Sequence, residues 1–571
     1  MGGGGGGGRW RGLGAAVAGA AVVSLAAQRY RRRHEVVTSR GVLVEEEEEE
    51  GTGDASPWIV HVVLDDVGMN DMLNSTDLPT SEVTPTLRAL ADEGVTLSNM
   101  YGQDYCTPSR VALLTGMFAH KTGFARTQGD DVGPAEVFTT SNFSIPLGVK
   151  LLPEYLQNAG YATHGIGKWN VGHCNEAYVP WKRGFLTFAG YFGDGIGYTT
   201  HYADTNRILT FPDGRSANVT DFFEYEGGEV VDWRRGLSYE GRHTIDVFTD
   251  MAVDRLSGAS GATYLYLSYH AVHDDLQSTS TLAYSKDKWD RLEDEYGLSS
   301  NREDFGIVLS AVDEAIGRVK ATLDDREVSY LLVVHSDNGG MPCSFRLCGN
   351  NLPYRGTKFH FFEGGVKVPA FVYSNDLLPT SRRGGTFDGL AHHVDWLATF
   401  LDAAGVDPAT VLDEASDSLS FWPGIRDVDA GPNRSEILFS ITQDSLALRI
   451  GDYKLLYQLD DSRWYSPDYR VASPRQLEKC NDGTLANHLF DLASDPHERT
   501  NLYHHRAYRE IREGLLAYGR ARYAADAISI PSGFAETDDP SLLAAWNATT
   551  DRDSDTVVAV PWGCQLIAMR E

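Results

Sequence analysis

A run of seven mostly apolar residues at positions 58–64 constrains the fold more strongly than any other feature. It reads Trp-Ile-Val-His-Val-Val-Leu and leads directly into Asp65 and Asp66. A run that is apolar on both faces is typical of a parallel strand buried inside a sheet. We interpret His61, within the run, as a structural residue. Ligands of open α/β sheets bind at the carboxyl ends of the strands, so we expect Asp65 and Asp66 to lie at a site.

Similar apolar runs alternate with helical patterns along the chain. The predicted strands are 161–166, 263–268, 330–335 and 368–373. A predicted helix begins near Pro85 and ends at Gly94, and further helical patterns cover 305–323 and 393–404. This alternation predicts an α/β fold in which helices flank a mostly parallel sheet.

The pattern changes after residue 430, where short strands follow one another closely. The predicted strands are 437–442, 445–450 and 453–458, with a turn at Gly451 and Asp452. We therefore expect a catalytic domain at 57–430. A smaller C-terminal α+β subdomain with an antiparallel sheet is expected at 431–571.

The first 34 residues contain no Asp or Glu, and Arg9 and Arg11 precede an apolar segment at 13–27. As a helix this segment would rise only about 22 Å, which is shorter than the ~30 Å hydrocarbon core of a membrane. We predict a signal peptide or signal anchor at 1–27. Arginines at positions 29 and 31–33 leave an organellar transit peptide open. Residues 28–56 read as a charged, disordered linker.

These features predict the secretory pathway, with a secreted, lysosomal, vacuolar or membrane-anchored luminal protein. Membrane association is expected only if the N-terminal segment remains as an uncleaved anchor. Asn-x-Ser/Thr sequences, which are compatible with glycosylation, occur at Asn74, Asn142, Asn218, Asn433 and Asn547.

The formal charge of -30 opposes non-specific binding to nucleic acid, so we expect no nucleic-acid partner. A site for an anionic substrate must then supply its own local positive charge. The six cysteines form no Cys-x-x-Cys pair, which argues against a zinc ribbon. Cys343 with Cys348, and Cys480 with Cys564, are possible disulfides in an oxidising compartment.

The stretch 106–116 reads Cys-Thr-Pro-Ser-Arg-Val-Ala-Leu-Leu-Thr-Gly. Pro108 suits the first turn of a helix, so Cys106 is predicted at the helix N-terminus, where an anionic group is stabilised. Arg110 lies one helical turn further on, on the same side. A lone cysteine before an amphipathic helix would more often be a buried core residue.

The whole string resembles the signature of the type I sulfatases, C-x-P-S-R-x-x-L-L-T-G, at every specified position. The resemblance implies the alkaline-phosphatase-like α/β fold. It also implies that the formylglycine-generating enzyme oxidises Cys106 to formylglycine (3-oxoalanine). In this family one hydroxyl of the hydrated formylglycine attacks the sulfur, and the second hydroxyl then expels sulfate.

Acidic and amide side chains follow two of the predicted strands. Asp65 and Asp66 come after the first, and Asp337 and Asn338 come after the strand at 330–335. Their oxygen atoms suit Ca²⁺ or Mg²⁺ and do not suit zinc. The resemblance implies that these four residues bind one divalent cation, usually Ca²⁺, beside the formylglycine at position 106.

The resemblance also assigns residues to the sulfate group and the leaving alcohol. Lys168 and Lys358 match sulfate-contacting lysines of the family and would act with Arg110 and the metal. His273 matches the histidine near the leaving oxygen and would act with Lys358 as general acid. His270 is its competitor. We favour His273 because the pattern His-x-x-Leu-Gln that begins there resembles the arylsulfatase B-like branch.

One position departs from the family. Related sulfatases usually have Lys-Trp-His, whereas this chain has Lys168-Trp169-Asn170. An amide cannot serve as a base near neutral pH, so sulfate release is expected to be slow. His173 lies three residues further along, and we do not assign it to this role.

We predict a sulfatase that hydrolyses aryl or carbohydrate sulfate esters. Two alternatives stay open. The first is a phosphonate or phosphodiester hydrolase of the same superfamily, which can share the metal and the formylglycine. The second is an inactive sulfatase-like binding protein, which Asn170 suggests.

Overall fold

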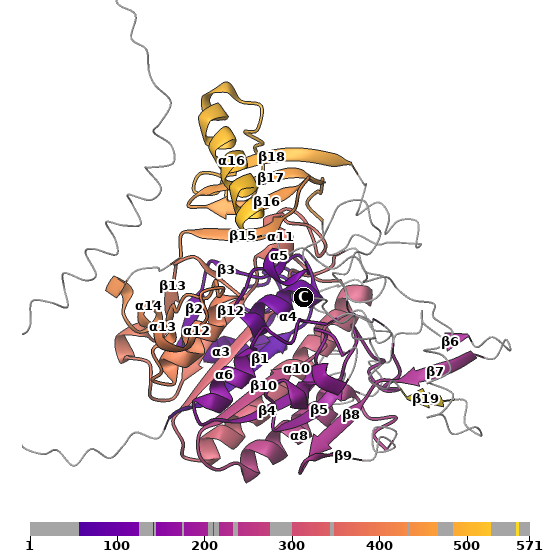
Figure 1. Ribbon diagram of the computed structural model, residues 1–571. Helices are drawn as coiled ribbons and strands as arrows, with labels where there is room; N and C mark the ends of the chain where they lie inside the picture. Colours follow the sequence, from indigo (N-terminus) through magenta and orange to yellow (C-terminus); the bar gives the residue numbers. More distant parts are fainter. Residues whose placement is uncertain are drawn as a thin grey trace, which may run out of the picture. The chain divides into compact units, whose positions relative to one another are not determined.

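The predicted strand at 58–64 lies inside a ten-stranded sheet with the order β13-β2-β12-β11-β1-β10-β4-β5-β8-β9 (Figure 1). β1 (Trp58–Leu64) pairs in parallel with β10 (Thr263–Ser268) on one side and β11 (Tyr330–Ser336) on the other. All seven residues of β1 are buried, which explains why all of them except His61 are apolar. His61 is structural, as expected: its Nε2 lies 2.7 Å from Nε2 of His335 in the core.

The computed structural model describes residues 56–124, 137, 141, 144–173, 176–203, 209–210, 216–231, 238–273, 282, 300–342, 348–430, 434–465, 484–526 and 556–558. The predicted signal segment and nearly all of the linker lie outside these residues. So do Asn142, Asn433, Asn547 and four of the six cysteines, at positions 174, 343, 480 and 564. Asn74 is described and is exposed.

Five neighbouring strands run parallel to one another at the centre of the sheet. β4 (Ala162–Lys168) pairs with β10, and β5 (Thr187–Tyr191) pairs with β4. β12 (Ala370–Ser374), β2 (Val95–Leu97), β8 (Phe223–Glu226) and β9 (Glu229–Val231) add antiparallel pairings, and β13 (Gly385–Phe387) is parallel to β2. The mostly parallel sheet is therefore confirmed. The predicted strand at 161–166 extends further, so that Lys168 is its last residue.

Helices cover both faces of this sheet. Val60, Val62 and Leu64 of β1 join a core with α3 (Pro85–Glu93), α8 (Thr244–Gly258) and α10 (Ser300–Asp325). Ile59 and Val63 face the opposite core, with α4 (Cys106–Thr115), α6 (Leu152–Asn158) and α12 (Asp395–Ala403). α10 and α12 confirm the helices predicted at 305–323 and 393–404.

Smaller elements complete the described residues. The short helices are α2 (Thr80–Val83), α5 (Ala119–Thr122), α11 (Glu363–Val366), α13 (Pro408–Val411) and α14 (Trp422–Arg426). Two small sheets pair β3 (Met100–Tyr101) with β14 (Ala391–His392), and β7 (Ser216–Thr220) with β6 (Leu209–Thr210) and β19 (Thr556–Val558). No helix in the described part of the chain is long and apolar enough to cross a membrane.

The C-terminal antiparallel sheet is also present. β15 (Glu436–Ile441), β16 (Leu446–Ile450) and β17 (Tyr453–Asp460) match the three predicted strands, and β18 (Leu485–Asp491) adds a fourth (Figure 1). α16 (Arg509–Asp526) packs on this sheet, where Gly519 approaches Leu446 and Leu448. The subdomain boundary at 430 and 431 stays a prediction.

Buried charges join the C-terminal sheet to the segment that includes α11. Nζ of Lys454, in β17, lies 2.8 Å from Oε1 of Glu363 and 3.0 Å from Oε1 of Glu498. All three side chains are at least 98% buried. Burial raises the pKa of Glu498 to about 7, although Lys454 opposes this shift. The lysine therefore compensates two carboxylates that water cannot reach.

We predict that Lys454→Met destabilises the protein by about 3–5 kcal/mol, because it leaves two buried carboxylates without their cation. The free energy of unfolding is measured by urea denaturation, with circular dichroism as the signal. Lys320→Met removes an exposed pair with Asp324 and serves as the control, with an expected change within about 0.5 kcal/mol. Equal effects of the two substitutions would contradict the role assigned to Lys454.

Candidate active site

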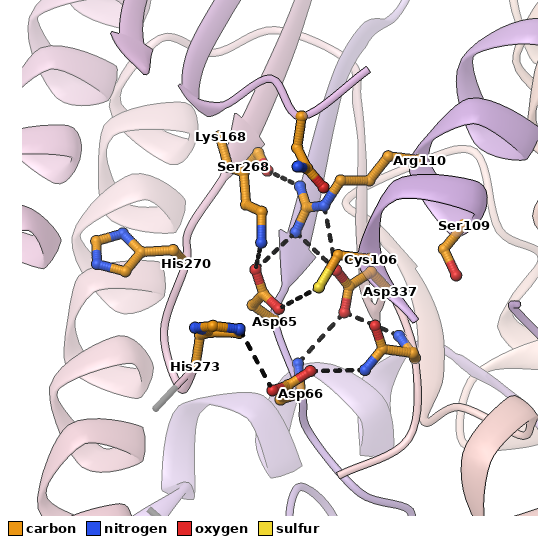
Figure 2. Close-up of polar contacts among 12 residues, drawn as sticks. Asp65, Asp66, Cys106, Ser109, Arg110, Lys168, Ser268, His270, His273 and Asp337 are labelled. Atoms are coloured by element: carbon orange, nitrogen blue, oxygen red, sulfur yellow. Dashed lines mark hydrogen bonds and ion pairs between the residues drawn. The ribbon is translucent and has the colours of Figure 1, made fainter. Parts of the chain in front are cut away.

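The predicted site residues meet at the carboxyl ends of the central strands (Figure 2). Asp65 and Asp66 follow β1, Lys168 ends β4, and Cys106 is the first residue of α4. The other predicted members are Asp337 and Asn338 after β11, Arg110 in α4, Lys358, and His273 after β10. All of these except His273 are buried. The fold therefore brings together residues from positions 65 to 358.

The three aspartates form a compact group. Carboxylate oxygens of Asp65, Asp66 and Asp337 all lie within 4.8 Å of one another. Asn338 Nδ2 donates to Asp66 Oδ1 at 2.7 Å, and Asn338 Oδ1 is buried with no hydrogen-bond partner among the described residues. A set of carboxylate and amide oxygens, one of them unsatisfied, fits a hard divalent cation such as Ca²⁺.

Burial and the negative charge of Asp65 raise the pKa of Asp337 to about 6, although Arg110 opposes the shift. Asp65 behaves differently. Burial alone would raise its pKa, but Lys168 and Arg110 outweigh burial and hold the pKa below its usual value. A bound divalent cation would relieve the repulsion that Asp337 experiences.

Arg110 connects three strands of the sheet. Its Nη2 lies 2.8 Å from Asp337 Oδ2 and 3.1 Å from Asp65 Oδ2. Its Nη1 donates to the hydroxyl of Ser268, the last residue of β10. The sequence analysis did not include Ser268 among the site residues. Its position at the end of the strand predicted at 263–268 was the only feature that could have indicated a place at the site. These contacts hold the charged guanidinium of Arg110 in one place within the site.

Two lysines bring further positive charge to the aspartates. Lys168 Nζ lies 2.6 Å from Asp65 Oδ2, and Lys358 Nζ lies 2.9 Å from Asp66 Oδ2. Burial would lower the pKa of Lys358, but the negative charges of Asp66, Asp65 and Asp337 and the Cys106 sulfur together outweigh burial and raise the pKa well above its usual value. With Arg110, the site holds three cations against three carboxylates. A bound divalent cation would make it positive, as an anionic substrate requires.

Cys106 lies against this cluster. Its Sγ donates to Asp65 Oδ1 at 3.4 Å, and the residue is 5% exposed. Burial and the charge of Asp65 raise the pKa of the Cys106 thiol well above its usual value. The unmodified thiol is therefore a poor source of thiolate, and thiolate is the reactive form of cysteine.

The two candidate histidines face in different directions. His273 Nε2 lies 3.9 Å from Asp66 Oδ2, and the side chain is 20% exposed. His270 is buried and stacks on Tyr198 at 4.5 Å, with its ring directed away from Asp65 (Figure 2). Tyr198, which sequence reasoning missed, donates its hydroxyl to the backbone oxygen of His273 at 3.0 Å. The geometry favours His273 for contact with a bound ester, and its role stays a prediction.

Asn170 takes part in a closed set of hydrogen bonds beside Cys106. Thr107 Oγ1 donates to Asn170 Oδ1 at 3.0 Å, and Asn170 Nδ2 donates to the backbone oxygen of Val137 at 2.7 Å. The Val137 N–H donates back to Thr107 Oγ1 at 3.0 Å. Asn170 thus positions the residue next to Cys106. His173 packs its ring on Phe192 at 5.0 Å.

We predict that Asp66→Asn weakens Ca²⁺ binding by at least about tenfold, because it removes one of the three charges around the cation. Asn tolerates the left-handed backbone of residue 66, where φ is 61°, so the fold should survive. Calorimetric titration with Ca²⁺ after chelation measures the effect.

The control for this titration is Asp250→Asn, which alters a partly exposed carboxylate in α8 that pairs with Arg242. The Asp250→Asn substitution should leave the affinity for Ca²⁺ unchanged. Wild-type affinity in the Asp66→Asn variant would show that the cation binds elsewhere.

Solved structures share this fold. The crystal structure of the sulfatase PsFucS1 from Pseudoalteromonas sp. aligns with a TM-score of 0.61 and 22% identity, over 83% of this chain and 92% of that chain. The structure of Ps i-CgsB in complex with a neocarrahexaose aligns with a TM-score of 0.62 and 21% identity, over 87% and 98% of the two chains. These likenesses confirm the alkaline-phosphatase-like fold class.

Sequence comparisons agree with this class. Mouse arylsulfatase J is 29% identical over 492 residues, which cover 79% of this chain and 73% of the relative. Pig N-acetylgalactosamine-6-sulfatase is 26% identical and covers 78% and 81%. An arylsulfatase of Hemicentrotus pulcherrimus is 27% identical and covers 77% of each chain.

These relatives define a sulfuric ester hydrolase. The family model described as Sulfatase matches residues 57–406, more than half of the sequence. The chain belongs to the sulfatase family, which confirms the family predicted from 106–116.

Proposed function

We propose that this sulfatase hydrolyses aryl or carbohydrate sulfate esters with a formylglycine made from Cys106 and one divalent cation, Ca²⁺. The observation that carries the proposal is the position of Cys106. Its Sγ lies 3.4 Å from Asp65 in a buried cluster where three basic side chains contact three carboxylates. A thiol with a raised pKa has little use there as a nucleophile, whereas a modified residue 106 would adjoin both the cation and the anion-binding groups.

Asp65, Asp66, Asp337 and Asn338 would hold the cation, which supplies Lewis-acid stabilisation of charge on the sulfate group when it is bound. Formylglycine at position 106 would supply the nucleophilic hydroxyl. The donor set and the unsatisfied oxygen of Asn338 support the cation, and the match of 106–116 to the family signature supports the modification.

Arg110, Lys168 and Lys358 bind and orient the sulfate group in this proposal. The N–H groups of Arg110 donate to Asp65, Asp337, Ser268 and Tyr266, so its guanidinium contributes a fixed positive charge to the site before the substrate arrives. The side chains of all three basic residues are at most 3% exposed, and the low dielectric there strengthens their attraction for charge that develops on the ester. These residues also keep the anion beside residue 106.

His273 and Lys358 protonate the departing alcohol. Lys358 carries a proton when the substrate binds because nearby carboxylates, Asp66 foremost, raise its pKa, and the side chains of both Lys358 and His273 lie close to Asp66. His273 is the more exposed of the two, which suits exchange of protons with water after each turnover. Lys358 can hold the ester oxygen while His273 recovers its proton.

We expect wild-type protein from a host that has the formylglycine-generating enzyme to hydrolyse 4-nitrophenyl sulfate with multiple turnovers. Cys106→Ala should lower kcat by at least about 10³-fold, because it removes the nucleophile. Release of 4-nitrophenol, followed by absorbance, measures both rates. A phosphodiester substrate tested in parallel should give the lower kcat/KM, and the reverse order would favour the phosphonate or phosphodiester alternative.

Asn170 is the observation that favours the alternative function, an inactive sulfatase-like binding protein. Its amide contacts Thr107 and Val137 and cannot act as a base. We expect an active enzyme with slow sulfate release. Rapid mixing should therefore show a burst of 4-nitrophenol close to the enzyme concentration, followed by a slower steady rate. If protein that contains formylglycine binds the ester but releases no 4-nitrophenol, the result would instead support an inactive binding protein.

The proposal includes maturation in the secretory pathway, where the formylglycine-generating enzyme would act on Cys106. Exposure of Asn74 supports glycosylation there. Sulfate esters are the expected ligands, nucleic acid is not an expected partner, and membrane association depends on an uncleaved N-terminal anchor.

A further inference from the structure

Phe359 has a backbone conformation that is unfavourable for its residue type. The His360 N–H donates to the Thr357 oxygen at 3.0 Å and closes a four-residue turn with Lys358 and Phe359 at its tip. The φ of Phe359 is 73°. This third position of such a turn favours glycine or asparagine, because a positive φ is strained for a residue with a bulky side chain. Strain of this kind is retained where the side chain has a use.

The turn is fixed from both sides. The Phe359 N–H donates to the Asp104 oxygen at 2.6 Å, and the Lys358 N–H donates to the Gly340 oxygen at 3.2 Å. Residue 359 is thereby held beside the chain that leads into Cys106, and residue 358 beside the segment that follows Asn338. The position of the Phe359 ring follows from this backbone arrangement.

The ring lies between two groups of the proposed site. Its centroid is 5.7 Å from that of Tyr105, the residue before Cys106, and 5.4 Å from Nζ of Lys358. Tyr105, Lys358 and His360 are buried, whereas Phe359 is partly exposed. The ring therefore packs on Tyr105, and the partly exposed residue lies next to a lysine expected to hold sulfate.

We propose that Phe359 is a specificity-determining residue whose ring forms a wall for the organic part of the substrate, and that the substrate carries its sulfate directly on a ring. This inference rests on the proposed function of the same site. An ester held beside Lys358 would place its organic group near the Phe359 ring, which is 5.4 Å from Nζ of Lys358 and belongs to a partly exposed residue. An aromatic wall offers a flat apolar surface to an aryl ring or to the apolar face of a pyranose.

The test compares three ligands that share the sulfate group. Phenyl sulfate carries its sulfate on an aryl ring, N-acetylgalactosamine 4-sulfate carries its sulfate on a pyranose ring, and n-hexyl sulfate has six carbons and no ring. Their dissociation constants are measured by calorimetry in calcium buffer on a Cys106→Ala background, which cannot turn them over. The result therefore does not depend on hydrolysis, and the activity of the wild-type enzyme is assayed separately.

Phe359→Gly removes the ring and suits the positive φ, so the melting temperature should not fall. We expect this substitution to raise the dissociation constant of at least one ring-bearing ester by about tenfold. The dissociation constant of n-hexyl sulfate should change by less than about twofold. The ester whose binding is weakened shows whether the substrate ring that packs on Phe359 is an aryl ring or a pyranose. Phe359→Tyr keeps the ring and should restore the affinity.

Unchanged affinity for both ring-bearing esters in Phe359→Gly would overturn the inference. An equal loss for n-hexyl sulfate would also overturn it, because the substitution would then act through Lys358 and the sulfate group. Failure of the proposed function has a different signature: wild-type protein would release no alcohol, whatever the affinities in the Cys106→Ala background.

Discussion

The contacts of Arg110 with Asp65 and Asp337 are the interaction on which the site depends. The three groups come from a helix and from the segments that follow two strands, and all are buried. Loss of one partner would leave a charge uncompensated in the interior, which costs about 3–5 kcal/mol in proteins. Ser268 adds a third strand to the same guanidinium. The cluster thus fixes Cys106, four residues before Arg110, against the carboxylates.

Three residues with positive φ and a side chain surround this cluster: Asp66 at 61°, Asn170 at 52° and Phe359 at 73°. Each lies at the site and each has polar or aromatic contacts there. Strained backbone persists where surrounding structure holds it. Part of that support comes from the C-terminal sheet, because Arg355 donates to Asp461 at 2.6 Å and Lys454 holds Glu363, on either side of Lys358. The two sheets therefore shape one site.

The sequence predicted the parts of the fold that depend on local pattern. β1, β10 and β11 were found within one residue, because strands buried on both faces have uninterrupted apolar sequences. β5 (Thr-Phe-Ala-Gly-Tyr) and β18 (Leu-Ala-Asn-His-Leu-Phe-Asp) mix small or polar residues with apolar ones and were missed. Motifs identified the chemical groups of the site. Ser268, Tyr198 and the Thr107 contact of Asn170 depend on tertiary packing of distant segments, which no local pattern encodes.

The most direct test of the account is peptide mass spectrometry of residue 106, in protein made by a host that has the formylglycine-generating enzyme. The account predicts the aldehyde or its hydrate at this position. An unmodified Cys106 would contradict it, because a buried thiol beside Asp65, with its raised pKa, could not supply the proposed nucleophile.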